Sequence, residues 1–203
     1  MRRAEMKYYL LREDVQFPER WYLGDIKHCN NWLFIDPPSE YMEPCTYALE
    51  VREKGVNLDF SLAGYASVPV LSEKARDALV GIPDVDEPYM NVVLEPVTVA
   101  GEQAHVCHYV MIVETQLDCV DESRSAFKKY EVNDPVRPDR AGEYSVFLNL
   151  VIDPAKVQGK HIFRVKKHLG ALIVSEDVKL RLERAGLTGM LFEGVNGEGE
   201  VVC

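Results

Sequence analysis

The stretch from Ala171 to Val195 carries strand, helix and strand signals in direct succession. Ala171 to Val174 is a short apolar run between a Gly and a Ser, which predicts a buried strand. Ser175 then has the position of a helix N-cap, because its hydroxyl can accept a hydrogen bond from a first-turn amide. Gly186 has the position of the C′ residue that ends the helix. Gly189 to Val195 returns as a strand.

The same pattern occurs earlier in the chain. Ala66 to Leu71 is an apolar run followed by Ser72 and a helical segment. Both copies place Ser-Glu at the junction and a leucine seven residues after the serine. The sequence therefore predicts two similar strand–helix units, and the alternative is a chance likeness between two capped amphipathic helices.

The rest of the chain alternates short strands with few helices. This pattern favours an α+β fold with a largely antiparallel sheet and two or three short helices. Pro96 predicts an edge or a bulge for its strand. We expect one domain over residues 1–203, and the polar, proline-broken linker 131–142 marks the alternative, a subdomain boundary. The further strands expected are Lys7–Arg12, Trp32–Ile35, Thr46–Arg52, Tyr89–Val99, His105–Glu114, Tyr144–Ile152 and His161–Lys166.

Charge and composition narrow the function classes. Thirty-three acidic residues against 23 basic ones give a formal charge of −10 and a pI near 5.0. Such a balance disfavours direct nucleic-acid binding, which needs a basic surface. It suits a basic protein partner, whose approach the field would accelerate.

The termini and cysteines bear on location. The N-terminal apolar run is too short for a signal peptide, and no segment approaches a membrane span, so we expect a cytoplasmic protein without membrane contact. Five cysteines form an odd set without a CxxC pair, which argues against a disulfide framework and a zinc finger.

Several residues are candidates for metal binding, nucleophilic catalysis or nucleotide binding. On a strand, His105 and Cys107 share a face while His108 points away, so no metal site is predicted. Cys119 lies between acidic residues that raise a thiol pKa, whereas a nucleophile needs a lowered one. No nucleotide-binding glycine motif and no GxSxG are present. No cofactor is predicted.

Two alternative functions stay open. One is a small hydrolase or metal-dependent enzyme built on Asp118, Asp121 and His108, which requires a pocket where these groups converge. The other is a structural or regulatory module that self-associates, for which the sequence leaves the oligomeric state open.

A set of short blocks resembles a bacterial family of polymorphic-toxin immunity proteins, family eleven. The likeness spans nearly the whole chain, and its specificity comes from the order of the blocks. They are Phe17-Pro18-Glu19-Arg20-Trp21, Asp59-Phe60, Val70-Leu71-Ser72, Pro96-Val97-Thr98-Val99, Leu117-Asp118 with Ser123-Arg124-Ser125, Ile162-Phe163-Arg164, and Ile173-Val174-Ser175-Glu176 with Ala185-Gly186-Leu187-Thr188-Gly189 and Phe192.

The resemblance implies a cytoplasmic antidote that binds a cognate toxin domain and blocks it without catalysis, in competition between bacteria. It carries over no catalytic, cofactor or metal residues. The acidic balance is compatible with masking a basic nuclease. For the toxin contact we predict two acidic loops. The alternative is that these loops only keep the protein soluble. The predicted contact residues are Asp36, Glu40, Glu43, Asp84, Asp86 and Glu87.

Overall fold

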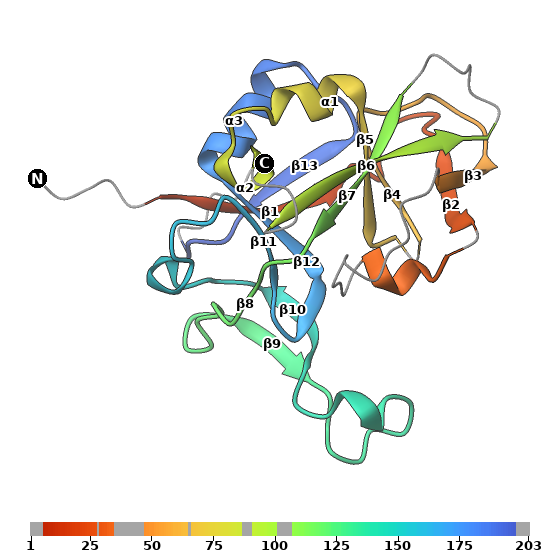
Figure 1. Cartoon of the computed structure of the whole chain (residues 1–203). Helices are drawn as coiled ribbons and strands as arrows, with labels where there is room; N and C mark the ends of the chain where they lie inside the picture. The colour runs from red at the N-terminus through yellow and green to blue at the C-terminus, as the bar shows by residue number, and fades with distance from the viewer. Residues whose placement is uncertain are drawn as a thin grey trace, which may run out of the picture.

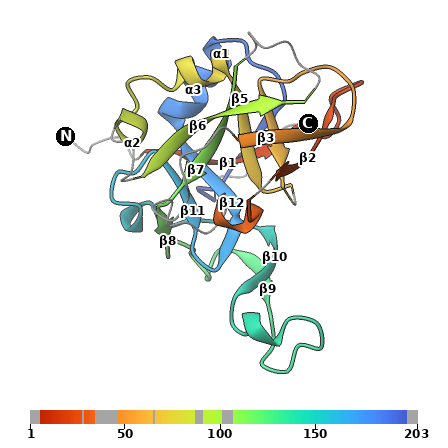
Figure 2. The same ribbon diagram turned by 45° about the vertical axis from the view of Figure 1, so that its right-hand side comes forward.

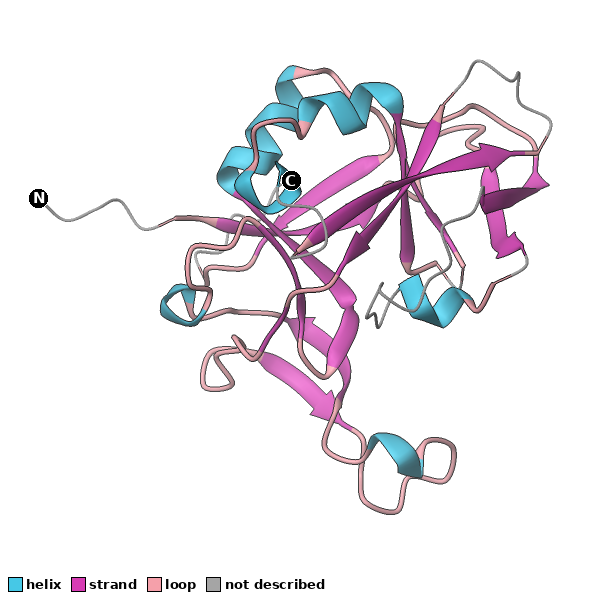
Figure 3. Ribbon diagram, in the orientation of Figure 1, coloured by secondary structure: helices cyan, strands magenta, loops and turns pink. Residues whose placement is uncertain are grey.

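Strands dominate the ribbon, and short helices lie beside them (Figure 3). The computed structural model describes residues 6–27, 29–34, 47–64, 66–86, 91–100 and 107–197. Most strand pairs are antiparallel, and the exceptions are β3 with β6 and β8 with β11. The α+β prediction is therefore confirmed. No helix within these ranges is long and apolar enough to cross a membrane.

The strands form three sheets (Figure 1). The five-stranded sheet has the order β13–β1–β12–β11–β8, with β1 Tyr8–Glu13, β8 Gln116–Leu117, β11 Ile162–Val165, β12 His168–Ser175 and β13 Met190–Gly194. The six-stranded sheet has the order β2–β3–β6–β7–β5–β4, with β2 Tyr22–Lys27, β3 Tyr47–Glu53, β4 Phe60–Ala63, β5 Val68–Ser72, β6 Val92–Val99 and β7 His108–Val113. The two-stranded sheet pairs β9 Ala126–Lys129 with β10 Tyr144–Asn149. The helices are α1 Glu73–Ala78, α2 Pro83–Asp86 and α3 Glu176–Arg184, and short 3-10 turns are η1 Asn31–Phe34, η3 Pro138–Arg140 and η4 Pro154–Lys156.

Both predicted strand–helix units are present. Ser72 caps α1 by accepting from the Ala75 amide at 3.2 Å, and Ser175 caps α3 by accepting from the Val178 amide at 3.4 Å. Gly186 follows α3 with a φ of 60°, a left-handed conformation that favours glycine. The two N-caps predicted from the sequence are thus confirmed.

The likeness of the units extends beyond the helices. Each unit begins with an antiparallel hairpin, β4–β5 or β11–β12, and in both the capping serine directly follows the last paired residue of the second strand, Leu71 or Val174. The strand after each helix, β6 or β13, pairs antiparallel with one further strand. That strand is β7 in the first unit and the N-terminal β1 in the second. The second unit is therefore closed by the opposite end of the chain.

The two units exchange polar contacts. Thr188, between α3 and β13, donates from its amide to the Asp59 carboxylate at 2.9 Å. In the reverse direction Asp84 on α2 accepts from the amides of His161 and Ile162, at 2.6 and 2.8 Å. The helices α1 and α3 lie side by side (Figures 1 and 2). Each helix-to-strand connection therefore secures the start of the other unit's hairpin.

A shared hydrophobic core lies between the units. One buried cluster joins β4, β5 and α1 of the first unit to β1, β11, β12 and α3 of the second; examples are Phe60, Leu79, Met111, Ile162 and Leu182. Two further clusters fill the outer faces, one around Trp21 and Phe34, the other around Tyr8 and Phe163. Together they make one continuous frame, which we define as residues 6–125 and 150–197 within the described ranges.

The segment 131–142 closes a hairpin. The strands on its two sides, β9 and β10, pair with each other. The hairpin extends away from the frame in two views of the molecule (Figures 1 and 2). We call residues 126–149 the arm.

Three local expectations were wrong. Residues 31–34 form the 3-10 turn η1 and no strand, while Ile35 lies outside the described residues. Residues 22–27 form β2, a strand that the sequence did not predict. Pro96 does not mark an edge, because β6 lies between β3 and β7. The β3 pairing begins only at Val97, so the missing N–H of the proline leaves no β3 carbonyl without its donor.

Candidate functional site

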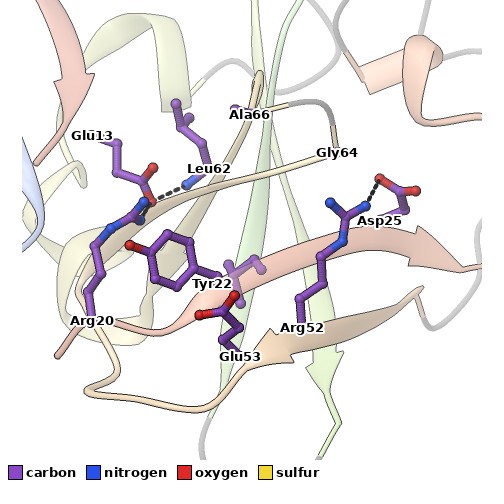
Figure 4. A pocket seen from close by; sticks show the side chains of 10 residues that line it. Glu13, Arg20, Tyr22, Asp25, Arg52, Glu53, Leu62, Gly64 and Ala66 are labelled. Carbon is purple, nitrogen blue, oxygen red and sulfur yellow. Dashed lines mark hydrogen bonds and ion pairs between the residues drawn. The ribbon is translucent and has the colours of Figure 1, made fainter. Parts of the chain in front are cut away.

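A polar groove lies where β1 ends beside β2, β3 and β4 (Figure 4). Its volume is about 400 Å³. The Arg20 guanidinium lies 2.7 Å from the Glu13 carboxylate, and both side chains are only 8% exposed. Glu13 also accepts from the Leu62 amide at 3.2 Å. Arg20 stacks over the ring of Tyr22, with 4.0 Å to the ring centroid.

The charges of this groove are largely matched inside the protein. Besides the buried Arg20–Glu13 pair, Arg52 lies 3.6 Å from Asp25 at the other end of the groove (Figure 4). A buried pair of this kind fixes local geometry more than it adds stability. Ion pairs within the protein therefore hold the charged side chains of this groove in place.

A second hollow is strongly acidic. Its volume is about 360 Å³, and it lies at the base of the arm. Arg124 donates to Asp121 at 2.6 Å, and the side-chain bonds from Ser123 and Arg124 lower the Asp121 pKa to about 2. The residues that line the hollow are Asp118, Val120, Asp121, Glu122, Tyr144, Asp153 and Lys156.

Glu122 connects the hollow to the arm. Its carboxylate accepts from the Tyr144 hydroxyl and from the Lys129 ammonium, each at 2.6 Å. The bond from Lys129, followed by that from Tyr144, lowers the Glu122 pKa, while burial raises the pKa of Tyr144. Asp121 and Glu122 are therefore ionised and oriented at neutral pH, each beside a base of the chain. With Asp118 and Asp153 the lining holds four acids against one lysine, which suits recognition of a positively charged group.

The structure does not bring the alternative enzyme residues together. His108 is buried in β7, with its ring centroid 5.4 Å from that of Trp21 in the six-stranded sheet. Asp118 and Asp121 line the acidic hollow beside β8. In the described part of the chain, no three His, Cys, Asp or Glu side chains gather in a way that could hold a metal ion.

The thiol of Cys119 is buried, and the rings of His161 and His168 bond to other residues of the fold. Burial raises the pKa of the Cys119 thiol to about 12, and Asp118 adds to the rise, as the sequence predicted. His161 lies 2.8 Å from the Ser175 hydroxyl through Nδ1, and His168 lies 3.1 Å from the Tyr144 carbonyl. These imidazoles therefore contact residues of β12 and β10.

Comparison with known protein families gives the decisive observation. A model of the immunity protein family (Imm11) matches residues 4–197, which is nearly the whole chain. The chain belongs to the Imm11 immunity protein family. This confirms the resemblance drawn from the sequence blocks. No curated protein matches the Imm11 chain.

The predicted contact residues of this Imm11 protein have different outcomes. Asp36, Glu40, Glu43 and Glu87 lie outside the described residues. Asp86 is exposed and accepts from the Gly81 amide at 3.2 Å. Asp84 is only 4% exposed and holds the start of β11, so its carboxylate is engaged inside the frame. The prediction therefore stays untested as a whole, with Asp84 assigned to the fold.

Sequence reasoning about the Imm11 chain missed both hollows. The groove collects Glu13, Asp25 and Arg52 from three strands, one of which was not expected, and Arg20 from the segment between β1 and β2. The acidic hollow adds Asp153 to Asp118 and Asp121, across more than thirty residues of chain. The cluster at 118–122 was visible as a run of acids, but the partner strands that complete it were not.

Proposed function

We propose that this Imm11 protein binds a cognate toxin domain and neutralises it by occlusion, without chemistry of its own. The observation that carries the proposal is the family match over residues 4–197. The protein would act in the cytoplasm of the toxin-producing bacterium, where it protects that cell from its own or a neighbour's toxin.

Burial of the side chains that could act in catalysis supports occlusion. The Cys119 thiol is buried with its pKa raised to about 12, so it is protonated at neutral pH. His108 is buried beside Trp21, and the acidic hollow has no imidazole in its described lining. Binding to a macromolecule needs only a complementary surface and no catalytic group.

Charge favours a basic toxin. The chain carries a formal charge of −10, and the acidic hollow adds a local set of oriented carboxylates. Complementary charge accelerates association of two proteins and excludes partners of like charge. A nuclease domain, whose surface must be basic to hold nucleic acid, is the toxin class that fits best.

Titration of toxin activity tests the proposal. The probe is the toxin domain encoded beside the gene, mixed with increasing amounts of the purified protein. Occlusion predicts that activity falls linearly and ends at one equivalent. An unrelated acidic protein of equal charge is the control and should not inhibit. Complete inactivation at a small fraction of an equivalent would show turnover, and no inhibition at any ratio would reject immunity to this toxin.

A further inference from the structure

The arm exposes an unusual share of apolar surface. Of the nine large hydrophobic side chains exposed in the described part of the chain, four lie on the arm. Val132, Val136 and Leu148 are 79%, 78% and 76% exposed, and Val146 is 41% exposed. Apolar side chains gathered on a protruding element are typical of a protein–protein contact.

The opposite face of the arm is anchored. The rings of Tyr144 and Phe147 lie 4.7 Å apart, and Phe127 packs edge-on against Tyr144 at 5.2 Å. Phe147 also meets the His168 ring of β12 at 5.1 Å. A register shift between Tyr144 and Val146 lets Tyr144 and Phe147 share this aromatic face. Val146 and Leu148 flank Phe147 along β10 and are exposed on the other side.

The tip of the arm is braced by its own bonds. Arg137 donates to Asp139 at 2.8 Å, and Arg140 donates to Glu143 at 2.6 Å. The Gly142 amide donates to the Tyr130 carbonyl at 2.9 Å, which closes the loop at its neck. Val132 and Val136 are therefore displayed on an ordered loop, and little conformational entropy is lost when a partner packs on them.

Charge selects the kind of partner. Four basic and four acidic residues balance within the arm, so the arm carries no net charge in a chain of charge −10. They are Lys128, Lys129, Arg137 and Arg140 against Glu131, Asp134, Asp139 and Glu143. At its base lies the acidic hollow, joined to the arm through Glu122. A second copy of this acidic chain would meet like charge there, whereas a basic partner would meet complementary charge.

We infer that the outer face of the arm, together with the acidic hollow at its base, is the docking surface for a basic toxin domain. This inference rests on the proposed function. The apolar side chains Val132, Val136, Val146 and Leu148 form the centre of the contact, and Asp118 lies at its acidic rim. Desolvated apolar anchors inside a polar rim are the usual source of affinity in such contacts.

A matched pair of double variants tests the centre of the contact. Val136→Ser with Leu148→Ser removes two arm side chains, and Val80→Ser with Leu191→Ser removes two exposed side chains of the frame, at 63% and 48% exposure. The affinity of each variant for the toxin domain encoded beside the gene is measured by calorimetry. The arm variant should bind at least about tenfold more weakly, as expected for loss of hot-spot side chains, and the frame variant within about twofold of wild type.

A charge variant tests the rim. Asp118→Asn at the hollow is compared with Glu50→Gln on β3, since both carboxylates are exposed. Rim charges act on encounter more than on the final complex. Asp118→Asn should slow association a few-fold at low salt and reduce its salt dependence, while Glu50→Gln should change neither.

The outcomes distinguish failure of the proposed function from failure of the docking surface. Absence of binding by the wild-type chain would reject the proposed function. Wild-type binding with equal affinity in the arm and frame variants would overturn the docking surface and leave the function standing. A wild-type dimer in sedimentation velocity that the arm variant disperses would assign the arm to a second copy and also overturn the inference.

Discussion

The frame buries its apolar side chains, whereas the arm leaves several of them exposed. In the frame, two similar units bury their apolar faces against each other, and Asp59 and Asp84 bond to backbone amides of the opposite unit. In the arm, one aromatic face packs on the frame, and the other face leaves Val136 and Leu148 more than three-quarters exposed. Stability and binding should therefore depend on different residues.

The largest effect is expected in the frame core. Phe163 is fully buried, and its ring lies 5.8 Å from that of Tyr8 in an edge-on contact between β11 and β1. Phe163→Ala removes the ring and leaves a cavity, so the free energy of unfolding should fall by about 4 kcal/mol. Urea unfolding followed by fluorescence measures it. A loss below about 1 kcal/mol would mean that this core does not hold the two ends of the chain together.

The second largest loss of stability is expected when a hydrogen-bond acceptor between the two units is removed. Asp84→Ala leaves the amides of His161 and Ile162 without their acceptor, and the predicted loss is about 2–3 kcal/mol. Asp86→Ala on the same helix is the matched control and should cost less than about 0.5 kcal/mol, since Asp86 is exposed. Equal costs at the two positions would contradict the assignment of Asp84 to the frame.

The two serine caps test the likeness of the units. Ser72→Ala and Ser175→Ala each remove a side-chain acceptor at a helix N-terminus and should cost about 1 kcal/mol. The partners sharpen the comparison: Ser72 also donates to Asp59 at 2.7 Å, whereas Ser175 lies against the His161 ring. Thermal unfolding of both variants should give similar losses, and an effect at one cap alone would show that the units are not energetically equivalent.

The smallest effect on stability is expected in the arm. Val136→Ala removes methyl groups that are mostly exposed, so the free energy of unfolding should change by less than about 0.5 kcal/mol. The same substitution in the frame, Val165→Ala at a fully buried position, should cost about 2 kcal/mol. Chemical denaturation of the two variants side by side tests the contrast, and similar losses would place Val136 in the folded core.

Local signals in the sequence predicted the units well. The serine caps, the terminal glycine after α3 and the strand of residues 171–174 depend on neighbouring residues, and all are present. The local signals gave wrong predictions where contacts with other segments of the chain determine the structure. Residues 31–34 have an apolar pattern but form a 3-10 turn, in which Asn31 donates to the Ile26 carbonyl at 2.8 Å. Pro96 fits in the central strand β6 because the pairing of β6 with β3 begins one residue later, at Val97.

The candidate site was less accessible to sequence reasoning. The polar segment 131–142 looks like a linker, since nothing in it shows that Phe127 and Phe147 will pair across it. Asp84 looks like a surface acid in an acidic loop, but its carboxylate is buried by contact with residues 161 and 162, more than seventy positions away. Both features depend on contacts between distant segments, which one sequence without its fold does not reveal.

The most direct test of the docking surface is hydrogen exchange of the wild-type chain, alone and with one equivalent of the toxin domain. The account predicts new protection of backbone amides in residues 126–149 and 118–122, with the edges of β2 and β3 unchanged. Protection confined to the groove at Arg20 and Tyr22, with the arm exchanging as in the free protein, would contradict it.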